Sequence, residues 1–128
     1  MTMSPASADP RQPSSFTVDR LRVFVHPDRR SMGAAAAARA AAVLREAIAR
    51  QGSARIVVAS APSQDELIAG LAAAPGIDWS HVTIFHMDEY VGLRETHPAS
   101  FRHYQRQHLL STVRPAAFHG IHGEDPDP

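Results

Sequence analysis

The stretch Arg55-Ile56-Val57-Val58-Ala59-Ser60-Ala61-Pro62-Ser63 passes abruptly from an apolar run into small and polar residues. Residues 55–59 form a short, almost wholly apolar segment, which is typical of a strand buried on both faces of a parallel sheet. The polar residues after it interrupt the strand and lead into a helix over 64–71, with Ser63 and Glu66 spaced as a capping box. A strand, a turn and a helix are therefore predicted in that order.

The same order of strand, turn and helix is predicted before this stretch. Residues 21–25 are rich in β-formers, and Asp28 is a candidate cap for a helix over residues 29–50, where Ala, Leu and Arg dominate. The helix is expected to bury one face, whose members lie four apart: Val43, Ala47, Leu44 and Ile48. Residues 1–15 are rich in Pro and Ser without periodicity, and we expect a disordered tail there.

The order also continues downstream. Residues 81–87 form a third β-branched and aromatic run, and a loop over 88–100 follows it. A third helix with a buried apolar stripe is expected next, and a fourth strand over 118–121; the stripe consists of Phe101, Tyr104, Leu109 and Leu110. Alternating strands and helices predict an α/β fold with three αβα layers and a Rossmann-like, mostly parallel sheet.

The composition excludes several functional classes. Thirteen basic residues, all arginine, balance thirteen acidic ones, which disfavours binding to nucleic acid or an anionic membrane. The absence of lysine and cysteine excludes a Schiff-base lysine, a cysteine nucleophile and disulfides. No apolar run approaches the roughly 20 residues of a membrane span, so we expect a cytoplasmic protein. A serine hydrolase is excluded because no Gly-x-Ser-x-Gly motif occurs.

Ligands of parallel sheets bind beyond the carboxyl ends of the strands, where the loops 60–64 and 88–100 are expected. The first combines hydroxyl groups with a helix N-terminus, as in an anion site, although an ordinary capped turn has the same pattern. In the second, Asp88 and Glu89 directly follow a hydrophobic strand, where burial and mutual repulsion would raise a carboxyl pKa toward the range of an acid–base catalyst. A pair of solvated or capping carboxylates is the alternative interpretation.

Some other polar and aromatic side chains are expected to be structural. His86 is interpreted as a packing or hydrogen-bonding residue and Trp79 as a core anchor, whereas Arg102 and Arg106 are expected on a solvated helix face. The eight histidines lack the spacing of a familiar metal site. No metal ligand is therefore predicted.

The string from Val82 to Leu93, followed by His97-Pro98-Ala99-Ser100-Phe101, closely resembles the glucosamine-6-phosphate deaminase family. That family's signature is a strand ending in Asp-Glu-Tyr-Val-Gly-Leu, followed by His-Pro-x-Ser-Tyr/Phe. The resemblance extends from Arg55 to about Gly123. It implies that residues 16–128 are the N-terminal portion of a sugar-phosphate isomerase/deaminase domain.

The resemblance also implies an activity. Members convert glucosamine 6-phosphate to fructose 6-phosphate and ammonia in amino-sugar catabolism, and they need no metal or organic cofactor. Asp88 takes the place of the proton acceptor and Glu89 that of a supporting residue, while Ser60, Ser63 and Gln64 match the loop that binds the substrate phosphate. The expected partner is a small sugar phosphate, and we leave a homo-oligomer of the complete protein open.

Two departures from the pattern limit this expectation. Family members usually have glycine after the first hydroxyl residue of the phosphate loop, whereas this chain has Ala61 and then Pro62, which has no N–H to donate. The family's catalytic histidine segment and distal phosphate ligands belong to a C-terminal half that these residues do not contain, so the chain alone is expected to be inactive. A 6-phosphogluconolactonase-like hydrolase and a non-catalytic sugar-phosphate-binding fragment stay open, although Tyr90 favours the deaminase.

Overall fold

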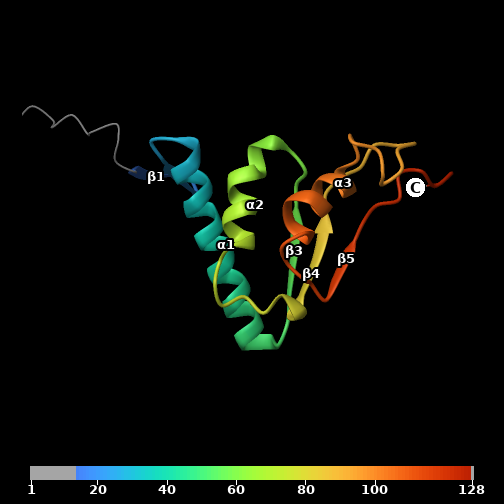
Figure 1. Cartoon of the computed structure of the whole chain (residues 1–128). Helices are drawn as coiled ribbons and strands as arrows, with labels where there is room; N and C mark the ends of the chain where they lie inside the picture. Colours follow the sequence, from blue (N-terminus) through green and yellow to red (C-terminus); the bar gives the residue numbers. More distant parts are fainter. Residues whose placement is uncertain (1–13, 128) are drawn as a thin grey trace, which may run out of the picture.

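The computed structural model describes residues 14–127, which form two sheets and three α-helices (Figure 1). The elements, in chain order, are β1 (Ser14–Val18), β2 (Leu21–Val25), α1 (Arg29–Gln51), β3 (Ala54–Val58), α2 (Asp65–Ala72), β4 (Val82–His86), α3 (Phe101–Gln105) and β5 (Ala117–His119). Short helical turns are formed by η1 (Pro62–Gln64), η2 (Trp79–His81) and η3 (Arg106–Leu110). None of the helices within 14–127 combines the length and the apolarity needed to cross a bilayer.

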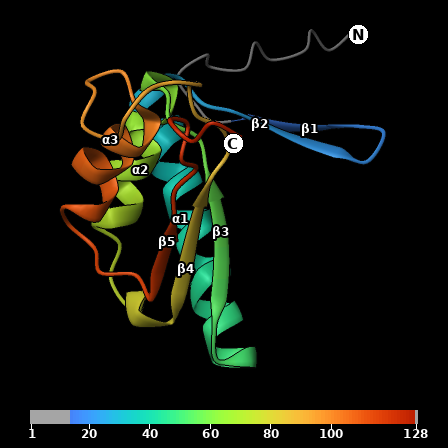
Figure 2. The same cartoon turned by 90° about the vertical axis from the view of Figure 1, so that its right-hand side faces the viewer.

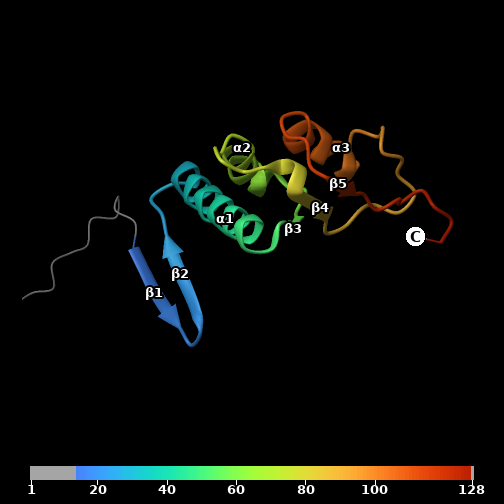
Figure 3. The same cartoon turned by 90° about the horizontal axis from the view of Figure 1, so that it is seen from below.

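The main sheet has three parallel strands in the order β3-β4-β5. The sequence predicted this α/β class and the parallel pairing, and both predictions are confirmed. The three helices lie on the same side of the sheet (Figure 3), so residues 14–127 form two of the three expected layers. The other side carries Val57, which is 63% exposed.

The predicted strand 21–25 is present as β2, but it does not join the parallel sheet. It pairs antiparallel with β1 in a separate hairpin that extends away from the helices (Figure 2). The reason is local: Asp19 adopts the left-handed conformation, with φ of 52°, which closes a two-residue turn between the strands. Ser14 and Ser15 belong to β1, so the boundary of the predicted tail was wrong there, and its residues 1–13 lie outside the described part.

Helix α1 begins where the sequence predicts. The Asp28 carboxylate accepts a hydrogen bond from the backbone N–H of Ser31 at 2.6 Å, and Gly52, whose φ is 79°, caps the C-terminus of the helix. The predicted buried face was only partly right, because Leu44 is buried whereas Val43 is 57% exposed. The actual face turned toward α2 consists of small residues, which allow the two helices to approach closely.

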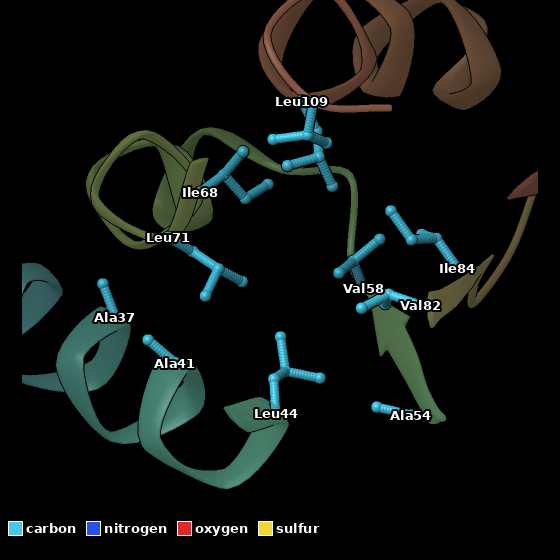
Figure 4. Packing of buried hydrophobic residues seen from close by; sticks show 11 residues of the cluster. Ala37, Ala41, Leu44, Ala54, Val58, Ile68, Leu71, Val82, Ile84 and Leu109 are labelled. Atoms are coloured by element: carbon cyan, nitrogen blue, oxygen red, sulfur yellow. The ribbon is translucent and has the colours of Figure 1, made fainter. Parts of the chain in front are cut away.

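The core lies between the helices and one face of the parallel sheet (Figure 4). Eleven buried hydrophobic residues form it: Ala37, Ala41, Leu44, Ala54, Val58, Ile68, Leu71, Val82, Ile84, Leu109 and Val113. Trp79 packs against this cluster as a partly buried residue, in agreement with its predicted role. Burying a large aliphatic side chain contributes roughly 1.5–3 kcal/mol, so these few residues hold α1 and α2 on the sheet.

The start of α2 differs from the prediction. Ser63 lies in η1 and makes no capping hydrogen bond, so the capping box is not formed. The Glu66 carboxylate accepts a hydrogen bond from Arg29 Nε at 2.6 Å instead. A tertiary ion pair between the first turns of α1 and α2 has thus replaced the local cap.

The predicted helix after residue 100 begins at Phe101 and continues from α3 into the π-helical turn η3. Of the predicted stripe, Leu109 is buried, and the other members are partly buried. Strand β5 starts at Ala117 and ends at His119, so the predicted range 118–121 was placed too late. Pairing with Thr83–Phe85 of β4 sets these bounds, because β5 is in register there.

Candidate functional site

The two loops predicted to carry function begin side by side at the carboxyl edge of the sheet. Val58, the last residue of β3, is in register with His86, the last residue of β4. The Met87 N–H donates to the Val58 carbonyl at 3.2 Å, which continues the pairing by one residue. The segments after the two strands therefore leave the sheet together, as the sequence predicted.

Asp88 and Glu89 are adjacent in the chain but lie in different environments. Asp88 is exposed at the start of its loop, whereas the Glu89 side chain is fully buried, with 0% of its surface exposed. Consecutive residues in an extended segment point to opposite sides, which separates the two carboxylates. They do not form the mutually repelling pair that the sequence suggested.

The Glu89 carboxylate lies at the N-terminus of α3. Oε1 accepts hydrogen bonds from the N–H groups of Tyr90 at 3.0 Å and Phe101 at 2.9 Å. Oε2 accepts from Ser100 Oγ at 2.8 Å and from both the N–H and Nε of Arg102 at 3.1 Å. Glu89 thus supplies the negative charge that the first turn of a helix favours, from a position outside that helix.

These contacts reverse the predicted pKa shift at Glu89. Burial raises the pKa of the carboxyl, but hydrogen bonds from the N–H groups of Phe101 and Arg102, from Ser100 and from Tyr90 lower it to about 2. A carboxylate bonded to several donors is stabilised in its charged form. Glu89 is therefore an ionised anchor, and the expectation of a raised pKa is wrong for it.

Arg102 is buried, which contradicts the predicted solvated position. Its side chain is 3% exposed and forms ion pairs with Glu89 at 3.1 Å and with Glu124 at 2.6 Å. Nη2 also donates to the Leu93 carbonyl at 2.9 Å. Its partners come from residues far along the chain, so no local pattern predicts this burial. Arg106, by contrast, is exposed and pairs with Glu95.

The segment after β5 returns over the Asp88 loop. The Gly92 N–H donates to the Gly123 carbonyl at 2.6 Å. Gly123 is buried, and a Cβ added to it would collide with the Tyr90 carbonyl. Glycine is therefore required at this contact, which brings residues 120–124 against the loop that carries Asp88.

His86 is buried, as its interpreted packing role requires, and it has a defined tautomer. Nε2 accepts a hydrogen bond from the Ile121 N–H at 2.8 Å, which places the proton of the neutral ring on Nδ1. Burial, the main cause, lowers the pKa of His86, so the neutral ring is favoured. Nδ1 has no hydrogen-bond partner within the described chain.

The loop after β3 contains the three predicted phosphate ligands. Ser60 is buried, and its hydroxyl group accepts from Gln105 Nε2 at 2.9 Å and lies 3.4 Å from the Phe101 carbonyl. Ser63 is exposed and Gln64 partly exposed, so these two side chains reach the surface. The loop is therefore divided into one residue bonded within the protein and two that are open to a ligand.

Helix α3 holds this loop through two side chains that the sequence did not single out for function. Tyr104 donates through its hydroxyl group to the Ala61 carbonyl at 3.0 Å and also contacts the Asp65 carboxylate. Gln105 Nε2 donates to the Ala59 carbonyl at 3.0 Å. Polar residues on the buried face of a helix could have indicated these contacts from the sequence, since a buried polar group needs a hydrogen-bond partner. Through them α3 connects both candidate loops.

The described residues contain no group of three or more His, Cys, Asp or Glu side chains placed to hold a metal ion. The site is instead an exposed carboxylate, two surface polar groups and a helix end beyond a parallel sheet. An exposed carboxylate at the end of a strand is a group that can transfer protons.

Fold and site together describe an α/β protein with a carboxylate at the carboxyl edge of its sheet. Residues 27–128 match the family model described as glucosamine-6-phosphate isomerases/6-phosphogluconolactonase. The chain belongs to this family. It is 33% identical over 91 residues to glucosamine-6-phosphate deaminase 2 of Bacillus subtilis, and 40% identical over 58 residues to glucosamine-6-phosphate deaminase 2 of Giardia intestinalis. These alignments cover 67% and 44% of this chain.

Solved structures agree with the fold. A 6-phosphogluconolactonase from Shewanella baltica OS155 superposes with a TM-score of 0.66 at 28% identity, over 74% of this chain and 40% of that one. A monomeric glucosamine-6-phosphate deaminase gives a TM-score of 0.69 at 18% identity, over 78% of this chain and 42% of that one. The chain spans only 36% and 22% of the lengths of the Bacillus and Giardia enzymes.

Proposed function

We propose that this chain supplies the base-bearing part of a glucosamine-6-phosphate deaminase, with Asp88 as the proton acceptor. The observation that carries the proposal is the separation of Asp88 from Glu89: one carboxylate is exposed beyond the middle strand of the sheet, and its neighbour is buried in an anchor. An exposed carboxylate on a fixed backbone has access to a substrate and a defined position, which proton transfer requires.

Asp88 would act on the open-chain amino sugar. Its carboxylate takes the proton from the carbon that bears the amine and returns it to the neighbouring carbonyl carbon, so the base is regenerated. The carbon that bore the amine becomes a carbonyl centre, water supplies its oxygen, and the nitrogen leaves as ammonia. Resemblance to the deaminases supports this sequence of steps.

We do not propose Glu89 as a second catalytic base. Its five hydrogen bonds leave the carboxylate without room for a substrate proton, and its pKa of about 2 makes it a poor acceptor near neutral pH. We assign it a positioning role: by closing the loop 88–100 onto α3, it fixes the backbone that carries Asp88. This replaces the supporting catalytic role expected from the sequence.

For the substrate phosphate we propose Ser63 and Gln64, because both belong to the η1 turn and reach the surface there. Ser60 would support the loop through Gln105 and bind phosphate only after exchanging that hydrogen bond. Pro62 offers no donor, and its carbonyl accepts from Arg29. A phosphate at this loop therefore depends on side-chain donors more than on backbone N–H groups.

The decisive experiment uses a fusion of this chain to the part of the Bacillus deaminase that it does not match. Asp88→Asn should reduce ammonia release from glucosamine 6-phosphate by at least about 1,000-fold, while calorimetric affinity for the sugar phosphate changes by less than about threefold. Asp125→Asn, at another exposed aspartate, is the control and should keep full turnover. Full turnover in the Asp88 variant would remove Asp88 as the base.

A lactonase is the second candidate, because a lactonase structure superposes well and the family model covers both activities. Tyr90 favours the deaminase; its ring packs against Phe101 with the centroids 4.8 Å apart. The same fusion should release no acid from 6-phosphogluconolactone above the uncatalysed rate. Acid release without ammonia release would favour the lactonase, and binding of the sugar phosphate without either reaction would favour a non-catalytic module.

A further inference from the structure

Residues 121–123 hold both ends of the loop that carries the proposed base. Before the base in the chain, His86 Nε2 accepts a hydrogen bond from the Ile121 N–H at 2.8 Å. After the base, the Gly92 N–H donates to the Gly123 carbonyl at 2.6 Å. We call these two hydrogen bonds the clamp. It fixes the end of β4 and the far end of the loop to one short segment.

The His86 contact is the half of the clamp that is made by a side chain. Val82 and Ile84 are alternate residues of the same strand and belong to the core, so the ring of His86 is directed to the helix side of the sheet. His86 is 5% exposed and packs against Phe118, with the ring centroids 5.6 Å apart. A buried donor that loses its acceptor costs more than an exposed one, because water does not replace the lost partner. The contact with Ile121 therefore matters for the local structure.

Protonation of His86 would change only the nitrogen that makes this contact. A neutral imidazole has one N–H donor and one acceptor nitrogen, whereas both nitrogens of the charged ring are donors. Since Nε2 accepts from Ile121, Nδ1 carries the proton of the neutral ring and is a donor in both states. In the charged ring the Nε2 proton would face the Ile121 N–H, and two donors do not bond. The clamp is therefore complete only with the neutral ring.

The surroundings of His86 favour this neutral form. Burial, the largest cause, lowers the pKa of the ring below its ordinary value of 6.5. The charges of Glu89 and Asp88, from the loop after β4, raise this pKa, and that of Arg102, from α3, lowers it. The segment after β5 contains two further titratable groups: His122 and Glu124. The strands β3 and β5 place uncharged side chains beside His86: Val58 and Phe118.

The direction of this shift fixes the direction of the pH response. Because the pKa of His86 lies below 6.5 in the folded chain, its contact with Ile121 is complete above pH 6.5 and is lost as the pH falls through the lower value. Glu89, whose pKa is about 2, stays ionised while the histidine titrates. Mild acid should therefore open the clamp at His86 and leave the Glu89 anchor in place.

We propose that His86 is a positioning residue for the loop that carries Asp88: its neutral ring ties the end of β4 to Ile121, and the clamp then holds the base between two fixed points. His86 acts through this loop and touches no reacting atom. Its catalytic consequence rests on the proposed function, whereas the clamp itself does not depend on the reaction.

The structural test uses NMR on the 128-residue chain. At neutral pH the ring nitrogen shifts of His86 should show the proton on Nδ1. The hydrogen-exchange protection of the Ile121 amide should fall by about tenfold or more as the ring titrates. The Phe101 amide, which bonds to Glu89, should keep its protection. A proton on Nε2 in the neutral ring, or an Ile121 amide equally protected on both sides of the titration, would overturn the proposal.

Two variants separate the acceptor from the charge. His86→Phe keeps a ring without an acceptor and should lower the protection of the Ile121 amide by about tenfold or more at neutral pH. His86→Gln offers an acceptor oxygen that does not titrate, so protection should persist and no longer depend on pH below 6.5. His119→Gln is the control, because His119 is exposed and stacks on Phe85. Full protection in His86→Phe, or an equal loss in the control, would contradict the assignment.

Turnover is measured in the fusion with the remaining part of the Bacillus deaminase. His86→Phe should lower kcat by about tenfold or more with KM changed less than about threefold, and His86→Gln should restore kcat and remove the fall of kcat in mild acid. Full kcat in His86→Phe, together with a lost Ile121 contact, would overturn the positioning role. A fusion that releases no ammonia even with His86 in place would count against the proposed function, while the exchange data would still decide whether the clamp exists.

Discussion

The Glu89 and Arg102 side chains form a buried ion pair, with 3.1 Å between Glu89 Oε2 and Arg102 Nε. Breaking such a pair from one side leaves an uncompensated charge away from water. Because Glu89 also holds the N-terminus of α3, this pair links the helix to the loop that carries Asp88. Its chemistry therefore governs both the stability and the acid sensitivity of the site.

Acid should destabilise the fold through Glu89. Its pKa is about 2 in the folded chain and 4.5 ordinarily, so the unfolded state binds more protons between these values. The stabilisation is complete above pH 4.5 and is lost as the pH falls toward 2, by roughly 3 kcal/mol in all. Denaturant unfolding between pH 2 and 4.5 should show this loss of stability. In the Glu89→Gln variant, the free energy of unfolding should depend less on pH over the same range. An unchanged slope in that variant, with Glu46→Gln as the control, would contradict the role given to Glu89.

Replacing Arg102 with Met should lower the free energy of unfolding by about 3 kcal/mol or more, because Glu89 then stays buried without its cation. The matched control is Arg106→Met, since Arg106 is exposed and its ion pair with Glu95 should contribute less than about 1 kcal/mol. Urea denaturation of both variants measures the difference. Equal losses would mean that burial does not distinguish the two arginines.

Tyr104→Phe should cost about 1–2 kcal/mol, because the variant loses the hydroxyl group that bonds to the Ala61 carbonyl and contacts Asp65. The loop 60–64 should also become more mobile, which amide hydrogen exchange at these residues would detect. Tyr90→Phe serves for comparison, as Tyr90 is 53% exposed. If exchange in the loop is the same in both variants, Tyr104 does not hold it.

Leu44→Ala should destabilise the chain by about 2–4 kcal/mol, since Leu44 is 4% exposed in the core. The neighbouring substitution Val43→Ala should change stability by less than about 0.5 kcal/mol, because Val43 is 57% exposed. Thermal unfolding of the pair gives the contrast directly. A large loss in the Val43 variant would contradict the exposed position of this side chain on α1.

The sequence predicted the elements whose signals are local. Asp28 indicated the start of α1, and the apolar run 55–59 indicated a strand of a parallel sheet; both are confirmed. The two loops at the carboxyl edge followed from this topology. These predictions succeeded because caps, breakers and apolar runs act within a few residues. The predicted burial on both faces of this strand was wrong, because Arg55 and Val57 of β3 are exposed.

Predictions that depend on distant partners failed. Arg102 was expected in solvent, but Glu89 and Glu124 pair with it from residues far away in the chain. Val43 lies next to Leu44 in the sequence, and only the direction of the sheet decides which of them is buried. The turn at Asp19 pairs β2 with β1, so β2 does not join the parallel sheet. Tertiary contacts decided the cases of Arg102 and Val43, whereas a local turn decided the pairing of β2.

The return of residues 120–124 over the Asp88 loop has a consequence for the order of folding. A growing chain emerges from its N-terminus, so β3, β4 and α3 are complete before Gly123 and Glu124 exist. Until those residues arrive, Gly92 lacks the carbonyl that fixes its N–H, and Arg102 lacks one of its two carboxylates. The strands can assemble first, whereas the proposed base reaches its final position only in a later step.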